Sequence, residues 1–352
     1  MEEIKDGKVK AGGGTAVIFS TAYLPLVGGA ETALKGITDN IDNFHFILLT
    51  SRFRKSLPST EKIGNTVIYR LGFGNSLDKY FLPLFSFFKF ISVKNNLQKP
   101  VLFWGMMASY GSIGAMLSKI FFPRIPFVLT IQEGDREWEK NKFWWRRILS
   151  KANFVTAISS FLLIEVRKAG YAGKAEIIPN GVELKNFQTP ISKSQSKIII
   201  SISRRVHKNG LDVLERAFDI VKKKFPEAEL KIISDAKPED VPRYLSEADI
   251  FVRPSRSEGL GTAFLEAMAA GLPIIATPVG GIPDFLKDRE TGLFTKVDDP
   301  EDLAEKIEML FNDEKLREKL IINGRKLVEE KYQWPKIARD MERMFDSLLW
   351  KF

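Results

Sequence analysis

Two glutamates with the spacing of a binding pair lie in the stretch RPSRSEGLGTAFLEAMAAGLPIIATPVGGIPD, residues 253–284. Glu258 falls in an expected loop, and Glu266 falls about five residues into an expected helix, roughly 7–8 Å along its axis. The two carboxylates therefore cannot act on one group, but each can accept both hydrogens of a vicinal diol. Two diols flanking a diphosphate describe a nucleotide sugar. The alternative is that Glu258 caps the helix and Glu266 lies on its solvated face.

Glycines and cations near this pair favour a phosphate ligand. Gly259 and Gly261 let backbone amides approach a ligand, and the helix that they precede presents its N-terminus to phosphate. The segment SISRRVHKNG places Arg204 and Lys208 at the carboxyl end of an expected strand. Cations there would neutralise a departing diphosphate without a metal. Solvated surface charge is the alternative, and we prefer it for Arg205.

Composition limits the chemistry to carboxylates, cations, hydroxyls and backbone groups. The 352 residues include no cysteine and two histidines, which excludes disulfides, zinc–thiolate sites and histidine-rich metal sites. The hydrophobic content of 44% and charged content of 28% are globular values. The net charge of +9 indicates an anionic partner, which could be nucleic acid, a membrane surface or a phosphorylated substrate.

Strand-like and helix-like segments alternate along two halves of the chain, which predicts an α/β fold with mostly parallel sheets. We expect two Rossmann-like domains facing across a cleft, at residues 15–186 and 187–330, after a flexible leader at 1–14. The leader carries six charges and no apolar centre, unlike a signal peptide. The uncharged stretch 101–118 is better read as a strand followed by a helix than as a membrane span.

Five pieces of the chain are typical of one enzyme family: YLPLVGGAE, IIPNGVELKNF, SRRVHKNGLDVLERA, the stretch from ADIFVRPS to GGIPD, and ETGLF. In these pieces the chain resembles the family 4 retaining glycosyltransferases of the GT-B fold. The resemblance implies that Arg204 and Lys208 bind the donor diphosphate, Glu258 contacts the sugar and Glu266 contacts the ribose. It further implies that the amides from Leu260 to Thr262 hold phosphate oxygens, and that residues 331–352 form a helix packing back on the first domain.

The resemblance is incomplete on the acceptor side. Where family members often carry His-Gly, this chain reads Gln132-Glu133-Gly134-Asp135, which makes Gln132, Glu133 and Asp135 candidates for acceptor contacts. Gly28 and Gly29 form a strand-to-helix turn that could approach phosphate or acceptor. We expect His45 to lie in the core.

The expected function is metal-independent, retaining transfer of a hexose-type sugar from a nucleotide sugar, UDP- or GDP-linked, to a lipid-linked, polysaccharide or other glycan acceptor. No cofactor is expected. The alternatives are a protein of this fold that binds or epimerises a nucleotide sugar without transfer, and a basic nucleic-acid-binding protein.

Segments 79–99 and 137–151 interleave aromatics with Lys and Arg. This pattern suits an anionic membrane, so we expect a cytoplasmic protein, peripheral on the inner face of the plasma membrane. Burial of these aromatics is the alternative.

Overall fold

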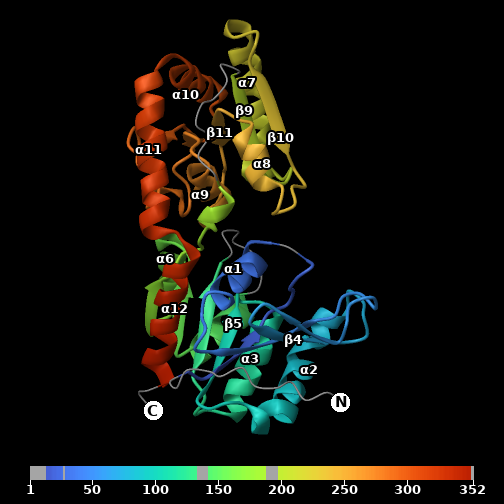
Figure 1. Ribbon diagram of the computed structural model, residues 1–352. Coiled ribbons are helices and arrows are strands. Elements are labelled where there is room, and N and C mark those ends of the chain that lie inside the picture. The colour runs from blue at the N-terminus through green and yellow to red at the C-terminus, as the bar shows by residue number, and fades with distance from the viewer. Residues whose placement is uncertain (1–12, 27, 133–141, 188–196, 350–352) are drawn as a thin grey trace. The chain divides into compact units, whose positions relative to one another are not determined.

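The computed structural model of the chain describes residues 13–26, 28–132, 142–187 and 197–349. It divides into two compact units, each drawn in Figure 1. Unit 1 holds the chain up to Ile158, the segment Leu162–Ile178 and the C-terminal part from Trp334. Unit 2 holds Ser159–Phe161 and Pro179–Gln333. Apart from Gly13 and Gly14, the expected leader lies outside the described residues.

Unit 1 is built on an eight-stranded sheet with the order β3-β4-β2-β1-β5-β6-β7-β8, parallel except for the β3–β4 pair. The central strand β1 is buried along its whole length, as a strand covered on both faces requires. The strands are β1 (Thr15–Phe19), β2 (His45–Ser51), β3 (Thr60–Ile63), β4 (Thr66–Leu71), β5 (Val101–Met106), β6 (Phe127–Ile131), β7 (Phe154–Ala157) and β8 (Lys174–Ile177).

The helices of unit 1 include the C-terminal one. They are α1 (Gly29–Thr38), α2 (Asp78–Val93), α3 (Tyr110–Phe121), α5 (Lys142–Lys151), α6 (Ser160–Lys168, whose first two residues belong to unit 2), α12 (Trp334–Leu349) and the short η1 (Lys94–Asn96). The stretch 101–118 divides into β5 and α3, as expected. Within the described residues, no helix combines the length and apolar character that crossing a membrane requires.

Helix α12 completes the core of unit 1. The Phe345 ring lies 5.4 Å from Phe44 and 5.3 Å from Trp104. At Gly36 of α1, a Cβ would lie 2.3 Å from the Trp334 ring, so a side chain there would displace the start of α12. The expected return of the C-terminal helix to the first half of the chain is confirmed.

Unit 2 contains a parallel five-stranded sheet with the order β10-β9-β11-β12-β13. The strands are β9 (Ile198–Ile202), β10 (Glu229–Ile233), β11 (Ile250–Arg253), β12 (Ile274–Ala276) and β13 (Leu293–Phe294). The helices are α7 (Leu211–Lys224), α8 (Val241–Ser246), α9 (Thr262–Ala269), α10 (Pro300–Asn312) and α11 (Glu314–Lys331), with short turns η2 (Leu184–Asn186), η3 (His207–Asn209) and η4 (Ile282–Asp284). Asp299 caps α10 by accepting the Asp302 amide at 2.9 Å, as its position before Pro300 predicts.

Candidate functional site

Three loops of unit 2 are held together at the carboxyl ends of β9, β11 and β12, where ligands of such sheets bind. Gly210 (φ 67°) lies against the first residue of the β11 loop, and a Cβ there would lie 2.0 Å from the Pro254 carbonyl oxygen. Gly280 (φ 57°) supports the same loop further along, because a Cβ would lie 1.8 Å from the Glu258 carbonyl oxygen. Only glycine fits these two contacts, so the glycines fix the loop that carries Glu258.

Glu258 is held by a buried arginine that sequence reasoning did not single out. The Arg253 side chain is 8% exposed, and its Nη2 donates to Glu258 Oε2 at 2.5 Å. The other oxygen, Oε1, accepts the Gly259 amide at 3.0 Å. The Arg253 guanidinium also stacks 4.4 Å from the centre of the Phe264 ring. Glu258 therefore does not cap α9; its carboxylate is oriented by Arg253 and stays 20% exposed.

Glu266 is half-buried in α9 rather than on a solvated face. Burial raises the pKa of its carboxyl to about 7, and the opposing field of Arg253 limits the rise. One guanidinium thus acts electrostatically on both glutamates, as a partner of Glu258 and as a neighbouring charge to Glu266. The sequence could have signalled Arg253, since a cation at the last position of a buried strand needs a partner.

The start of α9 offers backbone amides for an anion. Its N-cap residue, Gly261, has φ 91°, and no side chain caps the helix. Leu260 is 1% exposed, so only its backbone can face a ligand, whereas Thr262 is half-buried. The glycine-rich turn, the uncapped amides and the helix dipole together favour a phosphate group at Gly259–Thr262.

The loop after β9 carries cationic side chains on a backbone that is held by hydrogen bonds. Arg204 is exposed, and its carbonyl accepts from the side chain of buried Asn209 at 2.8 Å. Lys208 is half-buried, and its carbonyl accepts the amide of Arg256 at 2.7 Å. Arg205 forms an exposed ion pair with Glu215 at 2.8 Å, which confirms its expected surface role. The backbone that carries Arg204 and Lys208 is therefore held by Asn209 of the same loop and by Arg256 of the loop after β11.

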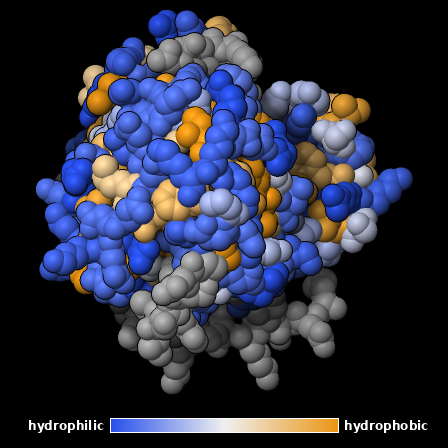
Figure 2. Space-filling model, turned by 90° about the horizontal axis from the view of Figure 1, so that it is seen from above, coloured by the Kyte–Doolittle hydropathy of each residue, from blue (hydrophilic) through white to orange (hydrophobic). Residues whose placement is uncertain are grey.

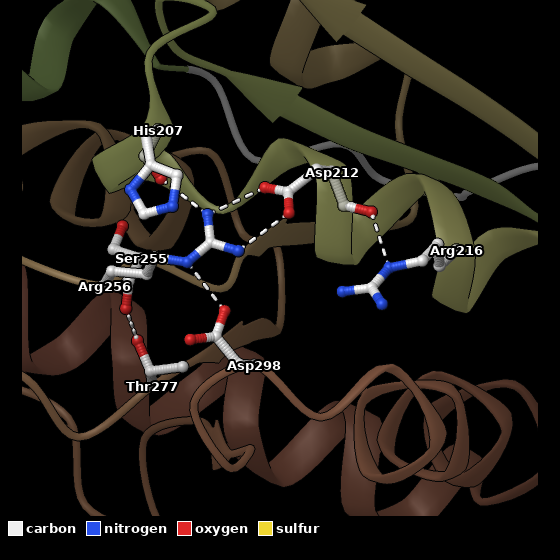
Figure 3. A network of polar contacts seen from close by, with 7 residues as sticks. All are labelled: His207, Asp212, Arg216, Ser255, Arg256, Thr277 and Asp298. Atoms are coloured by element: carbon white, nitrogen blue, oxygen red, sulfur yellow. Dashed lines mark hydrogen bonds and ion pairs between the residues drawn. The ribbon is translucent and has the colours of Figure 1, made fainter.

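Arg256 is the second residue that sequence reasoning missed, and Figure 3 shows it joining three segments of unit 2. Its guanidinium donates to both carboxylate oxygens of Asp212 at 2.8 and 2.7 Å. It also donates to Asp298 at 2.6 Å and to the His207 carbonyl at 2.7 Å. The hydrogen bond from Arg256 lowers the pKa of Asp212 to about 2. This network fixes the β9 loop, the first turn of α7 and the segment after β13.

The expected acceptor residues of unit 1 lie at strand ends as well. Gly28 is the N-cap of α1 and is exposed, and no atom lies within 4 Å of a Cβ built at Gly29. Glu31 turns back on this glycine turn, and burial raises the pKa of its carboxyl. Gln132 follows β6 and is half-buried.

Two expected acceptor residues, Glu133 and Asp135, lie outside the described residues. The expectation that His45 is buried is wrong: as the first residue of β2 it lies at the strand end, and its side chain is exposed. Within the described part of the chain, no group of three His, Asp or Glu residues is arranged to hold a metal ion.

The sequence left open whether the aromatic side chains around α2 are buried or exposed, and in the structure many of them are exposed. Large apolar side chains recur along one side of the helix and its start, and Phe121 of α3 is 63% exposed. We call this surface the α2 face; besides Phe121, its members are the N-cap residue Leu77 and the α2 residues Tyr80, Phe81, Leu84, Phe88 and Ile91. Asp78, the only acid of α2, is fully buried and accepts the amides of residues 73–75. By contrast, hydrophilic residues predominate on the face seen in Figure 2.

Comparison with solved structures identifies the architecture as the GT-B fold. Sucrose-phosphate synthase from Thermosynechococcus elongatus aligns with a TM-score of 0.80 and 20% identity, covering 96% of this chain and 99% of that one. Two family models match the sequence: Glycosyltransferase Family 4 at residues 27–186, and Glycosyl transferases group 1 at residues 232–327. The chain belongs to the family 4, group 1 glycosyltransferases.

Curated relatives match at low identity. An uncharacterized glycosyltransferase of Methanocaldococcus jannaschii, MJ1178, is 23% identical over 94% of this chain and 98% of its own length. A GDP-mannose-dependent monoacylated alpha-(1-6)-phosphatidylinositol monomannoside mannosyltransferase of Corynebacterium glutamicum is 29% identical over 57% of this chain. That match spans 64% of the relative's length.

Proposed function

We propose that this glycosyltransferase moves a hexose-type sugar from a UDP- or GDP-sugar to a lipid-linked or polysaccharide acceptor with retention of the anomeric configuration. The observation that carries the proposal is the Arg253-centred pair of glutamates beside an uncapped helix start. In this arrangement the sugar contacts Glu258 and the ribose contacts Glu266. The GDP-mannose donor and lipid acceptor named for the Corynebacterium relative support the same classes of substrate.

The residues of unit 2 have distinct parts in the proposed reaction. The bond between the anomeric carbon and the phosphate oxygen breaks, and negative charge collects on the leaving diphosphate. Arg204, Lys208 and the amides of Gly259–Thr262 stabilise that charge. The acceptor oxygen attacks from the face that the diphosphate leaves, and its proton passes to a leaving phosphate oxygen. The Arg253 contact holds Glu258 in position while the charge moves.

A donor screen tests this function. The purified chain is incubated with UDP-, GDP- and ADP-linked hexoses, with and without lipid-linked acceptors, and released nucleotide and sugar product are quantified. One donor should give acceptor-dependent nucleotide release, and Glu258→Gln should lower that rate at least about 100-fold, because it removes a charge that contacts the sugar. His45→Gln, a change at an exposed strand end, is the matched control and should leave the rate within twofold. Nucleotide binding without release, or an epimerised sugar, would replace transfer as the function.

The α2 face supports a site of action at the cytoplasmic leaflet of the membrane. Its exposed apolar side chains lie among cations, with Lys79 5.1 Å from the Tyr80 ring and Lys89 3.9 Å from the Tyr69 ring. Apolar groups flanked by cations suit an interface with anionic lipid. Phosphatidylglycerol vesicles should sediment the chain more efficiently than phosphatidylcholine vesicles, and Phe81→Asp with Phe88→Asp should abolish the difference. Sedimentation with neither vesicle type would contradict membrane action, and equal sedimentation with both would contradict the preference for anionic lipid.

A further inference from the structure

A groove of about 670 Å³ lies in unit 1 at the amino-terminal ends of β5 and β6. Ligand pockets commonly have volumes of about 300–1,000 Å³. The acceptor candidates Gly28 and Gln132 follow the carboxyl ends of β1 and β6, so the groove is at the opposite edge of the same sheet. Its wall is therefore not part of the site proposed for sugar transfer.

The groove combines an apolar interior with a cationic rim. Phe90 and Phe122 pack with ring centres 5.2 Å apart, and Leu348 and Leu349 of α12 contribute further apolar surface. None of its lining residues is acidic.

Three cations, Lys94, Lys99 and Arg124, also line it. The Lys94 ammonium lies 5.8 Å from the Phe122 ring centre. Within the described residues, none of the three forms an ion pair with a carboxylate. This charge pattern is complementary to an anionic head on an apolar chain.

The groove wall continues into the α2 face. Phe87 contacts two of the exposed rings of that surface, with centres 5.4 Å from Phe88 and 5.0 Å from Phe121. Phe122 follows Phe121 directly and lines the groove. A lipid in contact with the α2 face therefore lies next to an apolar slot with cations at its rim.

We propose that this groove holds one acyl chain of an anionic phospholipid taken from the bilayer on which the α2 face docks. Lys94, Lys99 and Arg124 contact the phosphate, and the aromatic and leucine side chains surround the chain. The inference deepens the proposed function and rests on its membrane part, but it concerns lipid binding and not sugar transfer. A chain held in this way would keep the enzyme at the surface from which a lipid acceptor is taken.

Dodecyl phosphate below its micellar concentration is the probe, with binding to the full chain measured by calorimetry. Lys99→Gln with Arg124→Gln should weaken binding five- to tenfold, because both side chains are exposed at the rim. The matched control, Lys151→Gln with Lys174→Gln, removes two exposed unit 1 cations that do not line the groove and should change affinity less than twofold. Ile125→Trp, which fills the groove, should weaken binding at least tenfold.

Folding of the Ile125→Trp variant is checked by its thermal unfolding and by nucleotide binding to unit 2. Equal affinities of the rim and control variants, or unchanged binding by Ile125→Trp, would overturn the proposal. Laurate bound more tightly than dodecyl phosphate would assign a free fatty acid instead of a phospholipid. A chain lacking residues 350–352 that binds at least tenfold more tightly would show that the chain's own end occupies the groove. If the groove proposal fails but the wild type still binds vesicles, the proposal that the α2 face docks on the membrane stands.

Discussion

Glu266 should couple nucleotide binding to pH. Only the ionised carboxyl accepts both hydrogens of a ribose diol, and burial raises the pKa of this group to about 7. Nucleotide affinity should therefore fall up to about tenfold per pH unit below 7 and level off above it. At pH 6, below this raised pKa, calorimetry in buffers of different ionisation enthalpy should detect proton release on nucleotide binding, and the release should disappear well above pH 7. Glu266→Gln should bind more weakly and without this pH dependence; a pH-dependent variant would point to another group.

The same carboxyl should make folding less favourable at neutral pH. Its folded-state pKa lies above the unfolded value of 4.5, so the folded chain binds more protons between pH 4.5 and 7. Stability therefore decreases as pH rises through this window, and the loss is complete above pH 7. Glu266→Gln should raise the free energy of unfolding by about 1–3 kcal/mol at pH 8 and change it little at pH 4. Urea unfolding at both pH values measures this, and a less stable variant at pH 8 would contradict it.

At the residue scale, sequence reasoning singled out the two glutamates of the proposed donor site but not the arginines that hold this part of unit 2. Glu258 and Glu266 stand out because their spacing around a glycine-rich turn suits a ligand. Arg256 looks like an ordinary surface cation, because its partners depend on loops folding back over the strand ends. The only sequence signal of Arg253 is its place at the end of a buried strand. Glu258 is five residues from Arg253, but Asp298 is 42 residues from Arg256, a separation that no local pattern reveals.

At the scale of elements, the glycine turn after β12 should matter for activity as well as for stability. Gly280→Ala places a Cβ 1.8 Å from the Glu258 carbonyl oxygen and must shift the loop that carries this carboxylate. Gly170→Ala is the matched control, because Gly170 has φ 95° but open space around its Cβ. Gly170→Ala should cost about 1 kcal/mol of stability from backbone strain, and Gly280→Ala should cost more because the clash adds to the strain. Only Gly280→Ala should lower kcat by tenfold or more. Similar kcat values for the two variants would contradict the loop's role.

The Arg256 network should support donor affinity through the β9 loop. Arg256→Lys keeps the charge but loses the two-pronged contact with Asp212, so the Lys208 segment is less firmly held. Because Asp212 and Asp298 are more than half exposed, the stability cost should be only about 1 kcal/mol, with a several-fold rise in the KM for donor. Arg205→Lys, in an exposed pair with Glu215, is the control and should change neither quantity. An unchanged KM for Arg256→Lys would limit the network to stability.

The sequence predicts the buried side of a helix where the apolar periodicity is strong. Where the periodicity is weak, as in α2, the sequence does not indicate which side is exposed. Helix α7 ends at Lys224 ahead of Pro226, and Leu214 and Val221 are buried, as the helical pattern predicts. Helix α2 is apolar on all sides, a pattern typical of full burial, yet one side is exposed. Which apolar side faces inward depends on α3 and β-strand contacts that a single sequence does not encode locally.

At the scale of the whole molecule, unit 2 should bind nucleotide by itself. All of its proposed donor residues, the Arg256 network and a separate hydrophobic core lie within residues 179–333. A fragment of these residues should fold cooperatively and bind UDP or GDP within about tenfold of the full chain, without transferring sugar. Calorimetry with the preferred nucleotide measures this, and Glu266→Gln in the fragment is the control. A folded fragment that fails to bind would show that unit 1 contributes to the donor site.

The return of α12 to unit 1 sets an order for synthesis on the ribosome. Residues 13–178 emerge first, but the surface that Trp334 and Phe345 cover stays bare until the last helix is made. With roughly 150 residues of unit 2 translated in between, the delay is about 10–30 s at ordinary elongation rates. During that interval the nascent first half presents an open apolar surface that a chaperone can bind, whereas unit 2 can fold as soon as it leaves the exit tunnel.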